Sequence, residues 1–221
     1  MKFKKIYSER TRLADEVYAQ IVEAISSGEV KADDRLVQEK LATELQISRT
    51  PVREALIRLE QEGMLVSSPR GGFVIHRLEP NEIKKIYQAR AAIEAQAARI
   101  LASNNDPQSN SRLKALIATE ENIESTTTKA YFTANRNIHR AFIEACDNRY
   151  LLEMFDNIWN RASSFQTFAE LGSLDLAKSL GHHIALVEAI ETGDVTKTTD
   201  VVIDHIFDGL NLQLEAITHR E

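Results

Sequence analysis

The sequence predicts a mainly α-helical fold in two parts: a small N-terminal part that includes a β-hairpin, and a larger part made of helices. Apolar residues recur at the three- and four-residue spacing of amphipathic helices along most of the 221 residues. Near residues 64–76 the pattern changes to two short runs rich in β-branched residues, separated by a Pro-Arg-Gly turn. The return to a helical pattern near residues 76–81 favours a domain boundary there.

The N-terminal part predicts three helices followed by the hairpin. The stretch LADEVYAQIVEAISSG carries one apolar stripe from Leu13 to Ile25 and ends at a glycine. Two short helices follow, in QEKLATEL and SRTPVREALIRLEQEG, where Ser48 is a favourable N-cap residue and Pro51 falls in the first turn. The runs MLVSS and GFVIH then predict the two strands.

The rest of the chain predicts an all-helical bundle. A long helix should run through PNEIKKIYQARAAIEAQAARILASNN, Pro107 should open the next, and TTTKAYFTANRNIH should lie in a third. Further helices are expected over residues 148–168, 173–192 and 194–218. This part is long enough to bury a core of its own, so we expect domains at 1–78 and 79–221.

The composition indicates a cytoplasmic protein without membrane contact. No apolar run is long enough to span a bilayer, the N-terminus lacks the apolar core of a signal peptide, and Cys146 is the single cysteine. The net charge of −6 is unevenly distributed, because residues 1–78 carry +1 (13 basic, 12 acidic) and the remainder carries −7. The total does not suggest a nucleic-acid partner, so the positions of the basic residues decide the question.

Three helices followed by a hairpin is the element order of the winged helix-turn-helix, which places one helix in the major groove of DNA. At the start of the third helix Arg49 and Arg53 share one face, and an arginine can grip both acceptors of a guanine. Arg70 lies at the hairpin tip, and Arg35 precedes the second helix, where it would clamp a phosphate. The alternative, that Arg49, Arg53 and Arg58 only solvate a surface helix, is disfavoured by the complete order of elements, with arginines only where DNA would be.

The segment DRLVQEKLATELQISRTPVREALIRLEQEGMLVSSPRGGFVI resembles the N-terminal domain of GntR-family bacterial transcription regulators. The matching features are the Arg-Leu pair, the Ser-Arg-Thr-Pro-Val-Arg-Glu-Ala-Leu run and the glycine-bearing wing. The resemblance implies a homodimer on a palindromic double-stranded DNA operator, and we expect repression. The residues implied in DNA binding are Arg35, Ser48, Arg49, Thr50, Arg53, Arg70 and Gly71.

Three histidines on different expected helices face the interior of the bundle. His139 lies four residues after Asn135 on a face with apolar neighbours, and His183 and His205 each align with an apolar stripe. One inward histidine is more often a hydrogen-bonded core residue than a metal ligand. Three of them in one bundle share a need for polar partners, which a divalent cation supplies. We therefore expect a metal site, with core histidines as the alternative.

The helical part also resembles the FCD group of GntR-type regulators, named after the fatty-acid-regulator C-terminal domain. The resemblance implies a small carboxylic or sugar acid as effector and, in many members, a divalent metal. The implied ligands are Asn135, His139, His183 and His205. Asn135 replaces the usual aspartate, so the two charges of the ion would lack compensation and an effector carboxylate would complete the shell. These ligands suit zinc, nickel or manganese without choosing among them.

Two arginines are candidates for effector binding. Arg90 lies on the inward stripe of the long helix, where a buried guanidinium needs a partner. Glu94, four residues on, is one candidate partner, and the FCD resemblance implies an effector carboxylate instead. Arg161, on a largely apolar helix, is the second candidate.

We expect this ligand-responsive regulator not to be an enzyme. A metal-dependent enzyme would need a general base near the three histidines, and Glu144 and Glu188 do not share their inward stripes. The other alternative is a metal-independent or fatty-acyl sensor on the same bundle, but an acyl pocket should not need three converging histidines.

Overall fold

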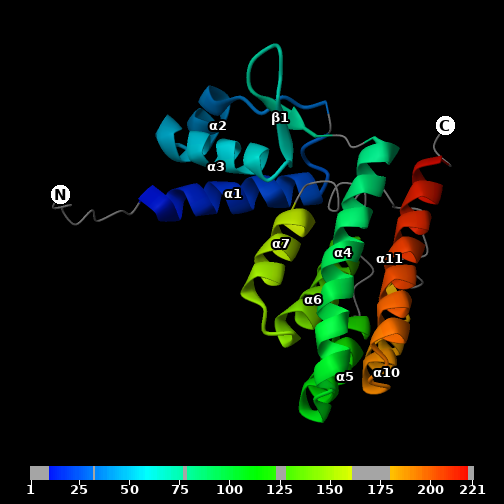
Figure 1. Cartoon of the computed structure of the whole chain (residues 1–221). Coiled ribbons are helices and arrows are strands. Elements are labelled where there is room, and N and C mark those ends of the chain that lie inside the picture. The colour runs from blue at the N-terminus through cyan, green and yellow to red at the C-terminus, as the bar shows by residue number, and fades with distance from the viewer. Residues whose placement is uncertain (1–9, 32, 77–78, 123–127, 161–179, 219–221) are drawn as a thin grey trace, which may run out of the picture. The chain divides into compact units, whose positions relative to one another are not determined.

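The computed structural model describes residues 10–31, 33–76, 79–122, 128–160 and 180–218. These residues form two compact units, the first ending at residue 76 and the second beginning at residue 79. The chain is mainly helical with one small hairpin in the first unit (Figure 1), so the predicted fold class is confirmed.

The first unit is a three-helix core that carries a hairpin. Its elements are α1 (Arg10–Ser26), α2 (Gln38–Glu44), α3 (Arg49–Gln61), β1 (Leu65–Ser67) and β2 (Phe73–Ile75). Both α1 and α2 pack against α3. The core is formed by Val17, Ile21, Ile25, Leu36, Ala42, Val52, Ala55, Leu56, Leu59, Met64, Leu65 and Ile75. The order of elements is the predicted winged helix-turn-helix.

The hairpin, or wing, is hydrogen-bonded to Leu36, two residues before α2. Strands β1 and β2 pair antiparallel. The backbones of Leu36 and Phe73 exchange two further hydrogen bonds, of 2.8 and 2.9 Å. The tip passes through Gly71 and Gly72 at φ values of 78° and 77°, a region that other L-residues rarely adopt.

Replacing Gly72 by alanine is expected to loosen the wing far more than the same change at Gly71. A Cβ on Gly72 would lie 2.6 Å from the Leu36 backbone oxygen, whereas a Cβ on Gly71 meets none of the described heavy atoms within 4 Å. Both changes carry a left-handed backbone cost of about 1–2 kcal/mol, but only Gly72→Ala adds a clash with a fixed carbonyl group.

Hydrogen exchange at the Leu36 and Phe73 amides measures this difference. Exchange should accelerate on the order of 100-fold or more in Gly72→Ala and only roughly tenfold in Gly71→Ala. Equal acceleration in the two variants would contradict the close approach of the wing to Leu36.

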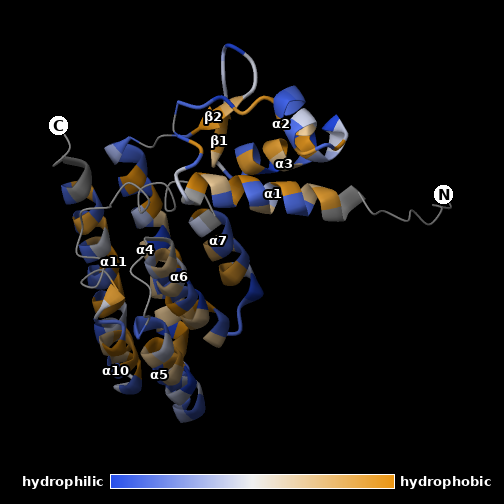
Figure 2. Cartoon of the chain, turned by 180° about the vertical axis from the view of Figure 1, so that it is seen from behind, coloured by the Kyte–Doolittle hydropathy of each residue, from blue (hydrophilic) through white to orange (hydrophobic). Residues whose placement is uncertain are grey.

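The second unit is a helical bundle arranged around one long helix. Its described elements are α4 (Pro80–Asn104), α5 (Pro107–Glu121), α6 (Thr128–Ala145), α7 (Arg149–Asn160), α10 (Ile184–Glu191) and α11 (Val195–Thr218). Helices α4 and α11 lie side by side in opposite directions (Figure 1), and α4 also packs against α6, α7 and α10. Figure 2 shows these helices apolar on part of their circumference, which is the pattern that predicted them. Among the described helices, none is both long and apolar enough to cross a membrane.

The main departure from the predicted helices is a break at residues 181–183. The sequence pattern predicts one helix over residues 173–192, but the chain leaves the helix after Leu180 and α10 begins at Ile184. Gly181 is a weak helix former, and His182 adopts a left-handed backbone with φ 78°. The prediction of one continuous helix is therefore wrong at this point. Residues 161–179, where the ends of two predicted helices fall, lie outside the described residues.

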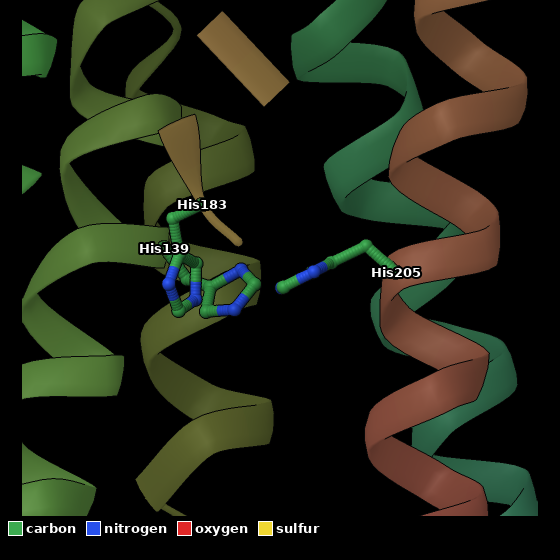
Figure 3. A group of neighbouring side chains, drawn as sticks. All are labelled: His139, His183 and His205. Carbon is green, nitrogen blue, oxygen red and sulfur yellow. The ribbon is translucent and has the colours of Figure 1, made fainter. Parts of the chain in front are cut away.

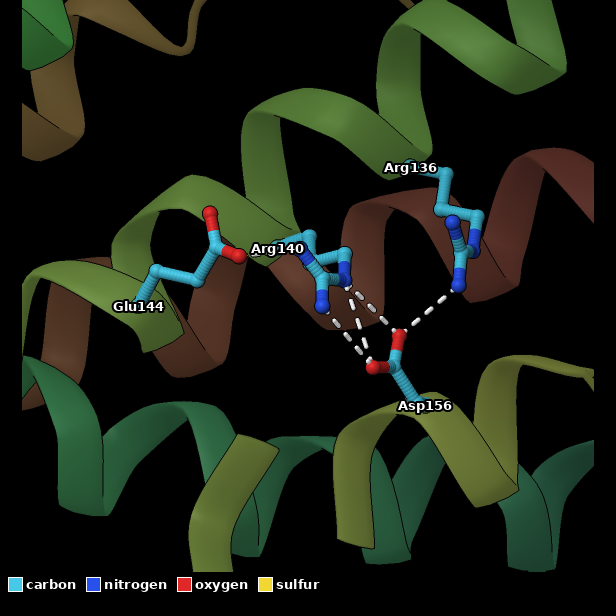
Figure 4. A network of polar contacts seen from close by, with 4 residues as sticks. All are labelled: Arg136, Arg140, Glu144 and Asp156. Atoms are coloured by element: carbon cyan, nitrogen blue, oxygen red, sulfur yellow. Dashed lines mark hydrogen bonds and ion pairs between the residues drawn. The ribbon is translucent and has the colours of Figure 1, made fainter. Parts of the chain in front are cut away.

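Ion pairs to α7 fix how α6 is turned about its axis. Arg136 Nη2 lies 2.7 Å and Arg140 Nε 3.0 Å from Oδ1 of Asp156 on α7 (Figure 4). Figure 4 also shows Arg140 paired with Glu144, which lies one turn further along α6. Asn135 and His139 each precede one of these arginines, and a one-residue step turns about 100° around the axis. Anchoring the arginines toward α7 therefore directs Asn135 and His139 to a different, buried face.

Candidate functional site

Three histidines converge inside the second unit. His139 comes from α6, His183 from the turn before α10 and His205 from α11 (Figure 3). One ring nitrogen of each lies within 4.8 Å of those of the other two, and the ring centroids are 4.7 to 5.3 Å apart. His139 and His183 are 3% and 0% exposed, and His205 is half-buried. The structure thus brings together the three histidines that the sequence singles out.

Carboxylates orient two of the three rings. His139 Nδ1 lies 2.6 Å from Oε2 of Glu94 on α4, and His183 Nδ1 lies 3.0 Å from Oε1 of Glu121 on α5. His183 Nδ1 also lies 2.8 Å from the carbonyl oxygen of Leu180. Because carboxylates and carbonyl groups only accept hydrogen bonds, Nδ1 carries the hydrogen in each neutral ring. The lone pair of Nε2 is then left for a ligand.

Asn135 faces the cluster through its side-chain oxygen. Its Oδ1 lies 3.0 Å from His183 Nε2, and the residue is 8% exposed. With the ring hydrogen on Nδ1, the two facing atoms both offer lone pairs, and a cation bound between them would satisfy both. Turning the amide would instead give an ordinary hydrogen bond. Three imidazoles and an amide oxygen are a donor set that fits a divalent transition metal.

The cluster borders a cavity of about 290 Å³. Asn135, His139 and His205 line this cavity together with Arg90. Asp204 and Asp208 of α11 also line it, with apolar walls from Leu186, Ile206 and Leu212. The combination of apolar walls and a few converging polar groups is typical of a small-molecule site.

Arg90 is buried and already has an acidic partner. Its Nε donates to Oε1 of Glu94 at 2.9 Å, and its guanidinium lies 4.2 Å from the centre of the Trp159 ring. Of the two interpretations of Arg90, the ion pair with Glu94 is the one seen. Because Arg90 also lines the cavity, an effector anion can reach the same side chain. Arg161, the other candidate, lies outside the described residues.

Burial and the neighbouring charges set the protonation of the cluster. Burial lowers the pKa of His139 to about 4, against the opposing influence of Glu94, and lowers the pKa of His205 to about 2. Burial alone would raise the pKa of Glu94, but Arg90 and His139 together bring it down to about 2. At neutral pH these two imidazoles are therefore uncharged beside a carboxylate, which is the protonation state that metal binding requires.

The first unit exposes the predicted DNA-binding residues at the start of α3. Ser48, Arg49, Thr50 and Arg53 are all exposed. Ser48 occupies the N-cap position with an extended backbone, but its side chain makes no capping hydrogen bond. Arg49 pairs with Glu39 of α2, and the two side chains are 64% and 72% exposed. A pair this exposed is weak, so a phosphate or a base can replace it.

On the wing, the structure joins two of the predicted residues directly. Arg35 Nη1 donates to the backbone carbonyl of Arg70. Arg35 therefore holds the wing tip, in addition to any contact with phosphate. Arg58 of α3 pairs instead with Asp15 and Glu62, and its guanidinium lies 4.1 Å from the centre of the Tyr18 ring. These contacts lie within the unit and indicate a structural role.

Sequence reasoning missed two acidic residues of the site. It identifies Glu94 only as a partner for Arg90, not for His139, and it does not identify Glu121. The available signal for Glu94 is its spacing, four residues after Arg90 and three before Ala97 on the inward side of the helix, since an acid there needs a partner. No pattern around Glu121 marks it, because its contact with His183 spans 62 residues.

A winged helix-turn-helix joined to a helical unit with a polar cavity defines the chain as a transcription regulator. The chain belongs to the GntR family of bacterial regulatory proteins, which its residues 13–75 match, and residues 85–208 match the FCD domain. The family predicted from the sequence is thereby confirmed.

Two relatives and one solved structure each match most of the chain. The uncharacterized HTH-type transcriptional regulator YdhC of Bacillus subtilis is 24% identical, covering 91% of this chain and 89% of that protein. A probable D-xylose utilization operon transcriptional repressor of Paenarthrobacter nicotinovorans is 25% identical, covering 89% and 87%. The structure of McbR/YncC of E. coli has a TM-score of 0.71 at 21% identity, covering 95% of this chain and 99% of that one, which shows a shared fold.

Proposed function

We propose that this protein is a cytoplasmic repressor that binds a palindromic operator as a homodimer and responds to a small carboxylate held at a divalent metal. The observation that carries the proposal is the shared cavity, which is lined by Asn135, two of the three clustered histidines and Arg90. Repression is supported by the relative described as a probable repressor of a D-xylose utilization operon.

The metal would be held by His139, His183 and His205, with Asn135 as a fourth ligand. Both oriented rings have Nε2 available, and Asn135 Oδ1 lies 3.0 Å from His183 Nε2, a separation at which one ion could bind both atoms. These ligands are all neutral, so they leave the charge of a divalent ion to other groups. An effector carboxylate that binds the metal on the cavity side and reaches Arg90 would supply one such charge. Arg161 remains a prediction as a second effector-binding residue.

On the DNA side, Arg49 and Arg53 would read base edges in the major groove. Ser48, Thr50 and Arg35 would contact phosphates, and the wing residues Arg70 and Gly71 would approach the backbone or groove. Effector binding would change operator affinity through linkage, so that operator DNA changes effector affinity by the same factor.

Two other functions are less well supported. A fatty-acyl sensor would need a long apolar pocket, whereas this cavity is about 290 Å³ and carries Arg90, Asp204 and Asp208 on its walls. A metal-dependent enzyme would need a general base at the metal. The two acids that contact histidines of the cluster among the described residues, Glu94 and Glu121, both lie on the Nδ1 side of the rings and not on the side that would bind metal.

The decisive experiment measures operator affinity with metal and acid separately and together. The full-length protein first selects its operator from a random-sequence duplex library. Binding to that duplex is then measured with Zn²⁺ alone, with a panel of small mono- and hydroxycarboxylates after chelation of metal, and with both. We expect only the combination to weaken binding, by about fivefold or more. Unchanged affinity under all three conditions would overturn the proposal, and an equal response to acids after chelation would remove the metal from it.

A further inference from the structure

One buried carboxylate joins the cavity arginine to a histidine of the cluster. Oε1 of Glu94 accepts from Arg90 Nε at 2.9 Å, and Oε2 of the same group lies 2.6 Å from His139 Nδ1. Arg90, Glu94 and His139 are 4%, 5% and 3% exposed. In such a poorly hydrated position the charges of Arg90 and Glu94 act strongly on each other and on the His139 ring.

In the series Arg90–Glu94–His139, the two outer residues border the cavity and the central residue does not. Arg90 and His139 are among the described residues that line the cavity, whereas Glu94 is not. A small acid in the cavity can therefore reach Arg90 and a metal on His139, but it acts on Glu94 only through its neighbours.

We propose that Glu94 is a positioning residue that couples anion binding at Arg90 to metal binding at His139. The inference rests on the proposed function, because it requires a metal on the histidine cluster. While Arg90 is bound to Glu94, the guanidinium offsets the negative charge that Glu94 presents to the His139 ring. An acid that pairs with Arg90 weakens this offset, so Glu94 polarises the His139 N–H more strongly and His139 becomes a better metal ligand.

This arrangement also answers how a site without the usual aspartate can compensate the metal charge. Glu94 supplies a negative charge next to the ligand His139. How strongly that charge acts on His139 depends on what is bound to Arg90. Binding of the metal would then raise the affinity for the acid, and the reverse, in addition to any effect of direct contact between them.

The second carboxylate of the site provides a matched comparison. Glu121 contacts His183 Nδ1 at 3.0 Å, much as Glu94 contacts His139. However, its charge neighbours are histidines, and no ion pair between Glu121 and an arginine is found among the described residues. Glu121 should therefore orient a ligand without connecting it to the anion.

The test is a Co²⁺ titration of the full-length protein, followed through the visible absorption of the bound ion. Wild type, Glu94→Gln and Glu121→Gln are titrated in chloride and again in acetate at equal ionic strength. Both variants should lose roughly 10- to 100-fold in Co²⁺ affinity, as changes to a ligand's hydrogen-bond partner commonly do. Acetate should raise the affinity of wild type and Glu121→Gln by a similar factor, about fivefold or more, and that of Glu94→Gln clearly less.

A third variant, Arg90→Gln, guards against a simple loss of folding, because its expected effect has the opposite sign. Without the guanidinium, Glu94 acts fully on His139, so Co²⁺ affinity in chloride should equal or exceed that of wild type. The acetate enhancement should be clearly smaller in this variant than in wild type, as in Glu94→Gln. Weakened Co²⁺ binding in Arg90→Gln would overturn the coupling even if Glu94→Gln fails to fold.

The remaining outcomes separate the two proposals. If wild type binds Co²⁺ but Glu94→Gln keeps its full acetate enhancement, or Glu121→Gln loses as much, the role of Glu94 is refuted while the metal site stands. If wild type binds no Co²⁺, the metal site and the coupling both fail.

Discussion

Replacing His183 by alanine is expected to lower the affinity of the protein for Zn²⁺ by about 100- to 1000-fold. A four-ligand zinc site binds with about 10–16 kcal/mol, so one ligand accounts for roughly 3–4 kcal/mol. His183 is fully buried, its Nδ1 is held by Glu121 and Leu180, and its Nε2 faces Asn135. Competition with a chromophoric chelator measures the loss.

The adjacent histidine is the natural control. His182 is exposed and borders the cavity, but it does not belong to the group whose ring nitrogens lie within 4.8 Å of one another. His182→Ala should therefore leave Zn²⁺ affinity within about threefold of wild type. Equal losses in the two variants, or none in His183→Ala, would show that the cluster is a set of core histidines. Thermal unfolding in a chelator checks that both variants fold.

Arg53→Ala is expected to weaken operator binding by at least about 30-fold. One arginine that grips a guanine contributes about 1–3 kcal/mol, and the proposed homodimer would lose that contact in both half-sites. Arg53 is exposed near the start of α3, and its guanidinium has no ion-pair partner among the described residues. Binding to a duplex of unrelated sequence should fall much less, because it depends mainly on total charge.

Arg58 lies five residues further along α3, and Arg58→Ala is the control that distinguishes the loss of a DNA contact from the loss of charge or stability. Arg58 pairs with Asp15 and Glu62, so Arg58→Ala removes the same charge from the same helix at a position that serves packing. This variant should lose some thermal stability and retain operator affinity within about threefold. If Arg58→Ala weakens binding as much as Arg53→Ala, the effect is one of net charge and the groove contact is wrong.

The fold was predictable because its helices and hairpin leave local signals. The long stripe after Pro80, the proline that opens α5 and the glycines around the wing each specify an element without long-range information. Prediction from apolar spacing failed at residues 181–183, where the spacing continues although the helix is interrupted. Periodicity records which residues face the core, and His183 does so from a turn as well as it would from a helix.

The candidate site was predictable only in part. Inward spacing identified His139, His183 and His205 one at a time, and the bundle brought them together. The partner of His139 was not predictable, because Glu94 lies 45 residues away and no local pattern joins them. The four-residue spacing of Arg90 and Glu94 correctly indicated that the two could pair, because residues four apart are neighbours on a helix.

The fastening of the wing bears on how fast the protein finds its site. The wing is tied where β2 begins, by the hydrogen bonds between Phe73 and Leu36, and at its tip by Arg35, which holds the Arg70 carbonyl. DNA therefore meets a wing whose shape is already set, and little chain entropy is lost when the complex forms. Encounter should then be governed by diffusion and by charge, so that the association rate falls steeply as salt is added.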